Sequence, residues 1–430
     1  MNRSIRYSRF GLQAARTALS VFMMVCLLVA AATPARATEP DPNAVPLTVD
    51  GVSALLIDAA RGQRLYAKQE DEPVRVGIAS RLMTVHLALT NAKPNALVTA
   101  SSEAAGVEDA QLSLRVGEKY GVEALCYAVL LTGASDAAVA LAEYTGGSVA
   151  EFVAMMNASA EKLGMHGTHF MNPTGRNDDH QVTTAADLAL FMKTALTDAN
   201  FARLFSAQAK PWYDDRKTTL LTNRNTMFWS FDGTDGGISG STDPQIESMI
   251  TTATRNGLRL ICILLDEPSA SKTADCTNLL NHGFTNYRYG KLVSAGQTLK
   301  TVTVENRSLN LLARTDAYYV YPIGEIFVQD MTAAVDESKM IPPILADVTV
   351  GKAIFTLADK TVIEVDLVPE SSILPQKTQW QLLWERMLAN REILMLVAIL
   401  SLVELIWFLS WIAGMLVRRI RRLRHPAGLR

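Results

Sequence analysis

Three serine side chains in this sequence have hydroxyl groups that could take part in nucleophilic chemistry. They are Ser80, which precedes Arg81, Ser135 in a second segment and Ser239 in a third. A serine hydroxyl is a weak nucleophile at neutral pH and needs a general base within hydrogen-bonding distance. Arg81 does not supply that base, because its guanidinium stays protonated far above neutral pH. The sequence therefore offers hydroxyl groups without an evident base.

Other kinds of chemistry receive little support from the residues present. His166 and His169 have the spacing of metal ligands, but no cysteine or carboxylate is spaced to complete a site with them. No glycine-rich phosphate loop is evident in the sequence. The formal net charge is −2 over 430 residues, which argues against nucleic acid as a partner. We expect neither a metal nor another cofactor.

Residue patterns indicate the helices that would position the first two serines. A helix is expected at 78–89, ahead of Pro94, and the apolar helical pattern at 124–144 is interrupted at Gly133. Ser80 therefore lies in the first turn of one helix, and Ser135 follows the interruption of another. Further helices are expected at 149–163, at 184–196 with a threonine cap, and at 274–282.

Alternating apolar residues predict two hairpins in the same region. One joins strands at 52–57 and 64–67 through Gly62, and the other joins 249–254 and 258–265 through Arg255-Asn256-Gly257. Helices that lie between early and late strands indicate a mixed α+β domain with an antiparallel sheet. From Gly290 onward, short alternating runs predict a small all-β domain, with strands at 300–304, 317–320, 348–357 and 360–368.

Both ends of the chain carry the patterns of targeting segments. Four arginines, an apolar run at 18–32 and then Ala35-Arg36-Ala37 predict a signal peptide that is cut before Thr38. Residues 393–417 are apolar over a length that crosses a bilayer, and five arginines follow them. This pattern predicts a single-pass protein of the cell membrane, with its C-terminus cytoplasmic and its bulk extracytoplasmic. An uncleaved N-terminal anchor and a buried soluble helix are the alternatives.

The segment before the apolar run and one residue within it add two hypotheses. Trp380, Leu383 and Trp384 lie along one helical stripe, which indicates an interfacial helix at 376–391 or, alternatively, a helix packed on the β domain. Glu404 lies inside the apolar run, where a carboxylate is costly. It is predicted either to hydrogen-bond with a second helix and drive association or to be tolerated as a protonated side chain.

The cysteines favour buried thiols over a disulfide framework. Cys126, Cys262 and Cys276 remain once the predicted signal peptide is removed. The first lies in an apolar helical run and the second in an apolar strand-like run, where a free cysteine packs as a small apolar residue. A single disulfide is the alternative.

The stretch 76–84 resembles the start of the active-site helix of the D-alanyl-D-alanine carboxypeptidases, the low-molecular-mass penicillin-binding proteins. In that family the stretch reads Pro-Ala-Ser-x-Thr-Lys-Leu-Met-Thr, with the Ser as the acylated nucleophile and the Lys as its base. Leu82-Met83-Thr84 match without a gap, so Ile78 occupies the nucleophile position and Arg81 the Lys position. Ser80 lies two residues further, about 200° around the helix, and would point away from the cleft.

The resemblance is strong over 52–284. Over 290–368 it rests on the position of the segment in the chain and on its short alternating runs. It implies a penicillin-binding-protein and β-lactamase-like transpeptidase domain of the α+β class, followed by a small all-β domain and a transmembrane helix. The matching segments include 136–143, 172–175, 183–189 and 255–260. The expected organisation is a signal peptide at 1–37, a linker at 38–51, the carboxypeptidase-like domain at 52–288, the β-rich domain at 289–370, a juxtamembrane segment at 371–392, the membrane helix at 393–417 and a basic tail at 418–430.

The other two motifs of the family are also altered here. Where the family has Ser-x-Asn, this chain has Gly133 and Ser135, which replace a proton-relaying Ser and a substrate-binding Asn. Where the family has Lys-Thr-Gly, this chain has Ile238-Ser239-Gly240, so the Lys that helps hold the substrate's terminal carboxylate is absent. The backbone donors of the family's oxyanion hole correspond to Ile78 and Ser241, and backbone N–H groups do not depend on side chains.

Loss at all three motifs, with the flanking residues retained, predicts a catalytically inactive homologue. Such a protein is expected to bind peptidoglycan stem peptide or a cell-wall synthesis protein. One alternative is an active serine hydrolase that uses Ser80, Ser135 or Ser239, and the other is a purely structural membrane anchor. The expected ligand-contacting residues of the cleft strand are Ile238, Ser239, Gly240 and Ser241.

Overall fold

The computed structural model describes residues 47–75, 77–93, 95–108, 112–214, 217–375 and 379–423. The predicted signal peptide, most of the predicted linker and the end of the basic tail lie outside these residues. The described chain forms two compact units. The first contains the residues up to Ser294 with Asp316–Met331 and Phe355–Ile363, and the second contains Ala295–Thr315, Thr332–Ile354 and the residues from Glu364 on.

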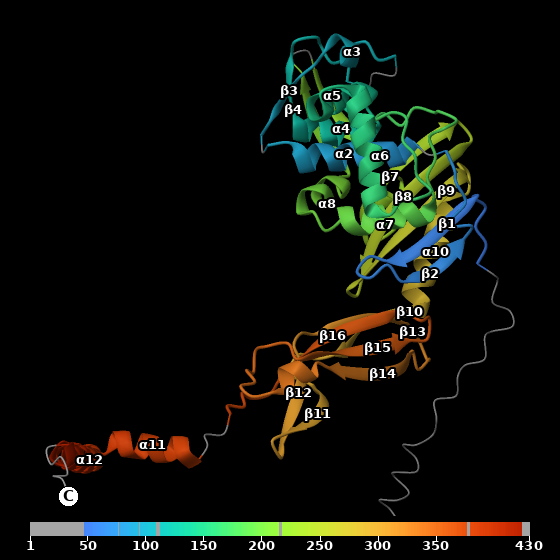
Figure 1. Cartoon of the computed structure of the whole chain (residues 1–430). Coiled ribbons are helices and arrows are strands. Elements are labelled where there is room, and N and C mark those ends of the chain that lie inside the picture. The colour runs from blue at the N-terminus through green and yellow to red at the C-terminus, as the bar shows by residue number, and fades with distance from the viewer. Residues whose placement is uncertain are drawn as a thin grey trace, which may run out of the picture. The chain divides into compact units, whose positions relative to one another are not determined.

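An antiparallel sheet of five strands, in the order β2-β1-β9-β8-β7, forms the centre of the first unit (Figure 1). Every residue of its strand β1 is buried, because alternate side chains enter two different cores. Leu55 and Ile57 join one core, and Ala54 and Leu56 join the other. The strands are β1 (Ser53–Asp58), β2 (Arg64–Lys68), β7 (Thr234–Asp243), β8 (Ile246–Arg255) and β9 (Leu258–Pro268).

Helices supply the rest of both cores. The core that contains Leu55 is built mainly with the helices that precede β7 in the chain. The core that contains Leu56 is built with α10 (Lys272–Asn286). The former group comprises α2 (Gly77–Asn91), α4 (Val122–Thr132), α5 (Ser135–Gly146), α6 (Val149–Leu163), α7 (Ala185–Ala195) and α8 (Ala199–Phe205). Short elements complete the unit: β3 (Leu97–Thr99), α3 (Ser102–Ala105), β4 (Lys119–Gly121), β5 (Ala209–Asp214), β6 (Lys217–Thr222) and α9 (Met227–Ser230).

The turns and caps predicted for this unit are confirmed. The two hairpins turn at Gly62 and at Asn256-Gly257, all with positive φ. The helical run is interrupted as expected, since α4 ends at Gly133, which has a φ of 74°. The Thr184 side chain caps α7 by accepting a hydrogen bond from the backbone N–H of Asp187.

The strands after α10 form two further sheets. Strands β10 (Tyr287–Val293) and β13 (Ala317–Pro322) pair in the first unit, and a five-stranded sheet has the order β11-β12-β16-β15-β14. Two strands of this sheet, β12 and β14, were not predicted from the sequence. Strand β14 is mostly exposed and its apolar residues do not alternate. In β12, Leu309, Leu311 and Ala313 alternate, so this strand could have been predicted. The strands are β11 (Thr298–Val304), β12 (Arg307–Ala313), β14 (Val328–Val335), β15 (Gly351–Leu357) and β16 (Val362–Pro369).

Two helices follow the last sheet. Helix α11 (Gln379–Ala389) falls within the predicted juxtamembrane segment, and its side chains are mostly exposed. Helix α12 (Arg391–Leu423) contains Leu394–Ile420, the one stretch of the described residues that is long and apolar enough to cross a membrane. The most apolar part of this stretch has no buried residue, and Glu404 lies within Leu394–Ile420. The three cysteines, Cys126, Cys262 and Cys276, are buried and free.

Candidate functional site

Helix α2 carries the two residues that the family resemblance assigns to the nucleophile and base positions. Ile78 and Arg81 are three residues apart and therefore lie on the same side of the helix. Ile78 is fully buried, and it shares its core with Ile238 of β7, which is also fully buried. Two of the three altered motifs thus contribute side chains to one apolar cluster rather than polar groups to a cleft.

The Arg81 side chain fills the space between the α4–α5 turn and β7. A Cβ atom built on Gly133 would lie 2.7 Å from both Cζ and Nη1 of Arg81. A Cβ atom built on Gly240 would lie 3.0 Å from Nη1 of Arg81 and 2.7 Å from Cγ2 of Ile78. Nε of Arg81 donates a hydrogen bond to the carbonyl of Thr174, at 3.0 Å. The guanidinium therefore occupies the place where a serine at position 133 would begin.

A cavity of about 250 Å³ opens beside this guanidinium. Arg81, Arg176 and Arg224 all line it, and none of the described lining residues is acidic. Burial, and then the nearby positive charge of Arg224, lower the pKa of Arg81 to about 10. The remaining lining residues are Thr132, Gly133, Ser135, Thr174, Gly175, Asn177 and Ser241.

The predicted serines occupy different surroundings. Ser135 and Ser241 reach the cavity wall. Ser80 is fully buried, and its hydroxyl has no hydrogen-bond partner in the described structure. A ligand in the cavity therefore does not meet the Ser80 hydroxyl.

Ser239 belongs to an internal polar network instead. Its hydroxyl donates a hydrogen bond to Oε2 of Glu247 on β8, at 2.9 Å, and the same carboxylate forms an ion pair with Lys272 at the start of α10. Both side chains of the ion pair are largely buried, at 22% exposure for Glu247 and 13% for Lys272. The hydroxyl that replaces the family's Thr is thus already satisfied by a carboxylate of this chain.

Sequence reasoning missed two charged residues of this site. Arg176 and Arg224 lie outside the three motifs, and only folding brings them to the cavity beside Arg81. It also missed the ion pair of Glu247 and Lys272 that engages Ser239. The predicted β8–β9 hairpin gave one usable signal for Glu247, because β8 then has a free edge with which β7 pairs.

A separate cluster of carboxyl groups is the one place in the described structure where several acidic side chains converge. Carboxylate oxygens of Asp50, Glu267 and Asp275 lie within 4.8 Å of one another. The Glu267 carboxyl accepts hydrogen bonds from the N–H of Gly51 and the hydroxyl of Ser271, both at 2.9 Å. Burial, and then a hydrogen bond with Asp275, raises the pKa of Glu267 to about 7. A proton held between the two carboxyl groups accounts for their proximity.

This shared proton should make the protein less stable as pH rises. The pKa of Glu267 is raised from 4.5 in the unfolded chain to about 7 in the folded state, so between these values the folded state binds more protons. We expect the contribution of Glu267 to the free energy of unfolding to be largest below pH 4.5 and to fall as the pH rises to about 7. Urea unfolding from pH 4.5 to 8 measures this slope.

Glu267→Gln should flatten that pH dependence, because the amide mimics the protonated carboxyl. Glu337→Gln, at an exposed position, is the matched control and should leave the slope unchanged. An equal slope in the wild type and in Glu267→Gln would contradict the assignment.

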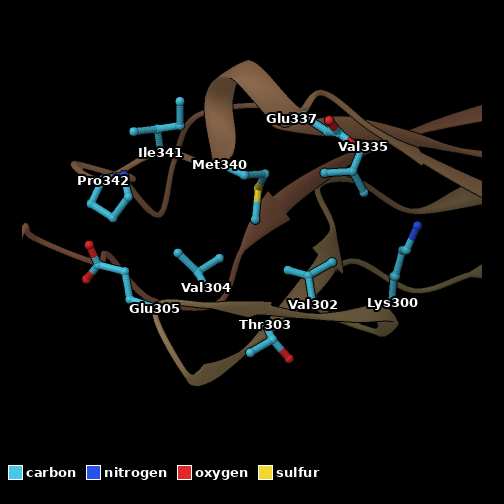
Figure 2. A pocket seen from close by; sticks show the side chains of 10 residues that line it. All are labelled: Lys300, Val302, Thr303, Val304, Glu305, Val335, Glu337, Met340, Ile341 and Pro342. Atoms are coloured by element: carbon cyan, nitrogen blue, oxygen red, sulfur yellow. The ribbon is translucent and has the colours of Figure 1, made fainter.

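Another cavity, of about 540 Å³, lies in the C-terminal sheet. Figure 2 shows Val302 and Val304 of β11 pointing toward Met340, with Thr303 pointing away. Lys300 stands at one end, and its ammonium donates a hydrogen bond to the carbonyl of Ala333, at 2.7 Å. Apolar and charged side chains both line this cavity, and the charged ones are Lys300, Glu305 and Glu337.

Two family models match the chain. The one described as D-alanyl-D-alanine carboxypeptidase matches residues 37–269, and the one described as penicillin-binding protein 5, C-terminal domain, matches residues 287–373.

Relatives and solved structures with the same description are similar along most of the chain. The D-alanyl-D-alanine carboxypeptidase DacF of Bacillus subtilis is 27% identical over 357 residues, which is 81% of this chain and 91% of the relative. A D-alanyl-D-alanine carboxypeptidase of a Streptomyces species is 30% identical, over 63% of this chain and 98% of the relative. The crystal structure of penicillin-binding protein 5 from Haemophilus influenzae shares the fold with a TM-score of 0.64, at 23% identity, and covers 77% of this chain and 100% of that chain.

Proposed function

Because the chain belongs to the D-alanyl-D-alanine carboxypeptidase family, we propose that it is a membrane-anchored member that binds peptidoglycan stem peptide without hydrolysing it. The observation that carries this proposal is the arrangement of Ile78, Arg81 and Gly133. An alkyl group stands at the nucleophile position, and a guanidinium fills the space of the second motif's serine.

The chemistry of acyl transfer supports the same conclusion. Ile78 has no nucleophilic atom, and Arg81 remains protonated at neutral pH even with its pKa lowered to about 10. The cavity itself remains open and polar, with Ser135 and Ser241 on its wall. Binding therefore survives the substitutions better than catalysis does.

The membrane-proximal part of the chain supports an extracytoplasmic location for the folded units. Helix α12 is apolar over Leu394–Ile420, and arginines follow at Arg421, Arg422 and Arg424. Positive charge favours the cytoplasmic side of a bilayer, so the folded units lie on the other side, where peptidoglycan is found.

The full-length protein should form no covalent adduct with penicillin and release no D-alanine from a D-Ala-D-Ala peptide. The reason is the missing nucleophile at position 78. Intact-mass spectrometry after exposure to excess penicillin measures the first, and a coupled D-alanine assay measures the second. A stoichiometric adduct would refute the proposal. Repeating the measurement with Ser135→Ala would then show whether Ser135, which lines the cavity, is the acylated group.

A further inference from the structure

The cavity beside α2 collects positive charge without an internal counter-ion. Arg81, Arg176 and Arg224 line it, and no described lining residue is acidic. Arg176 pairs with Glu108, Nη2 to Oε2 at 3.2 Å, but Arg224 makes no hydrogen bond or ion pair with any described residue. Like charges gathered in a partly buried site favour a bound anion. The electrostatics of the cavity therefore select an acidic group on a ligand.

The terminal nitrogens of Arg81 place that acidic group beside the nucleophile position. A Cβ atom built on Gly240 would lie 3.0 Å from Nη1 of Arg81 and 2.7 Å from Cγ2 of Ile78, so these two atoms are neighbours. Nε is engaged with Thr174, whereas neither Nη atom donates a hydrogen bond to a described residue. A carboxylate paired with these Nη atoms lies next to Ile78 and accepts two parallel hydrogen bonds.

The strand on the other side of the cleft disfavours a carboxylate. Ser239 is bound to Glu247, and Glu247 is paired with Lys272. Ile238 is buried in the core. A ligand carboxylate lying along β7 therefore finds neither a free hydroxyl at Ser239 nor a lysine at position 238.

Hydrolysis of a D-Ala-D-Ala terminus moves the terminal carboxylate by one residue. Water adds across the last peptide bond, the terminal D-alanine leaves with a new amino group, and the former peptide carbonyl becomes a carboxylate. That carbonyl is the group that faces the nucleophile position, which is Ile78 in this chain. The product carries its charge where Arg81 stands, and the intact peptide carries its charge one residue further along β7.

We propose that this cleft recognises stem peptides that have already lost the terminal D-alanine, with the new carboxylate held by Arg81 and Arg224. This inference rests on the proposed function, because it assumes that stem peptide enters the old cleft in the family's direction. The protein then binds the product of a carboxypeptidase rather than the substrate of that enzyme.

Calorimetric titration of the full-length protein in detergent tests the proposal with four probes. They are diacetyl-L-Lys-D-Ala, diacetyl-L-Lys-D-Ala-D-Ala, the amide of diacetyl-L-Lys-D-Ala, and inorganic phosphate. The first peptide should bind about tenfold or more tightly than the second and the third, because only the first presents a carboxylate to Arg81. Arg224→Gln should weaken binding of the first peptide about tenfold or more. Arg307→Gln, at an exposed arginine of β12 outside the cavity, is the matched control and should change nothing.

The outcomes separate this inference from the proposed function. Equal or tighter binding of the D-Ala-D-Ala peptide, or indifference to Arg224→Gln, overturns the inference and leaves stem-peptide binding in place. Phosphate binding as tightly as the first peptide also overturns it, because the site then recognises any anion. Failure of both peptides to bind overturns the proposed function as well. The same titration with Arg81→Lys reports on the second arginine while keeping the positive charge.

Discussion

Penicillin should acylate the variant that carries Ile78→Ser, Arg81→Lys, Gly133→Ser, Ser135→Asn and Ile238→Lys, but it should not acylate Ile78→Ser alone. The single variant has a hydroxyl with no base, since Arg81 stays in place and stays charged. A positioned base contributes about 10² to 10⁴ in rate, and residues that act as a unit are not additive. The second-order rate of adduct formation by intact-mass spectrometry should therefore differ by at least about 10² between the two.

The single variant should also be less stable, which provides an internal check. Ile78 and Ile238 are fully buried in one cluster, and truncating a buried isoleucine costs about 2–5 kcal/mol. The matched control is Ile78→Val, which keeps the apolar contacts, adds no hydroxyl and should remain unacylated. If Ile78→Ser alone is acylated as fast as the five-residue variant, the assignment of Arg81 to the base position is wrong.

Gly133→Ser alone should destabilise the protein by about 2–5 kcal/mol, and adding Arg81→Lys should recover a large part of this loss. The new Cβ meets the Arg81 guanidinium at 2.7 Å, and overpacking of this kind costs about 1–3 kcal/mol. The positive φ of 74° adds about 1–2 kcal/mol for a residue with a side chain. Urea unfolding of both single variants and the double variant gives the coupling energy.

Gly164→Ser is the control that separates the two costs. Gly164 ends α6 with a φ of 79°, and a Cβ built there has nothing within 4 Å. It should lose only the backbone cost and show no coupling to Arg81→Lys. Equal losses at Gly133 and Gly164 would show that the guanidinium moves away without cost, which contradicts the steric part of the prediction.

Much of the fold followed from local patterns in the sequence. Gly62, Asn256 and Gly257 marked the turns of two hairpins, and Gly133 marked the break between α4 and α5, because each holds a backbone conformation that few residues adopt. The family motifs predicted which residues lie together, since Leu82-Met83-Thr84 fix the register of α2. In the structure Arg81, Gly133, Ser135 and Ser241 line one cavity.

The electrostatics of the cleft did not follow from the sequence. Arg224 and Arg176 come from segments far from α2, and no local pattern marks them as neighbours of Arg81. Lys272 is paired with Glu247 only because α10 begins beside β8. Such contacts between distant segments depend on tertiary packing, which residue spacing does not encode.

The contact between Arg81 and Gly133 also limits how this chain can change over evolutionary time. A serine introduced at position 133 while Arg81 remains lowers stability, and a lysine introduced at position 81 alone has no nucleophile to activate. Either substitution made alone is therefore harmful or without benefit for catalysis. Selection acting on one substitution at a time does not bring a serine to position 133 and a lysine to position 81, because the two positions must change together.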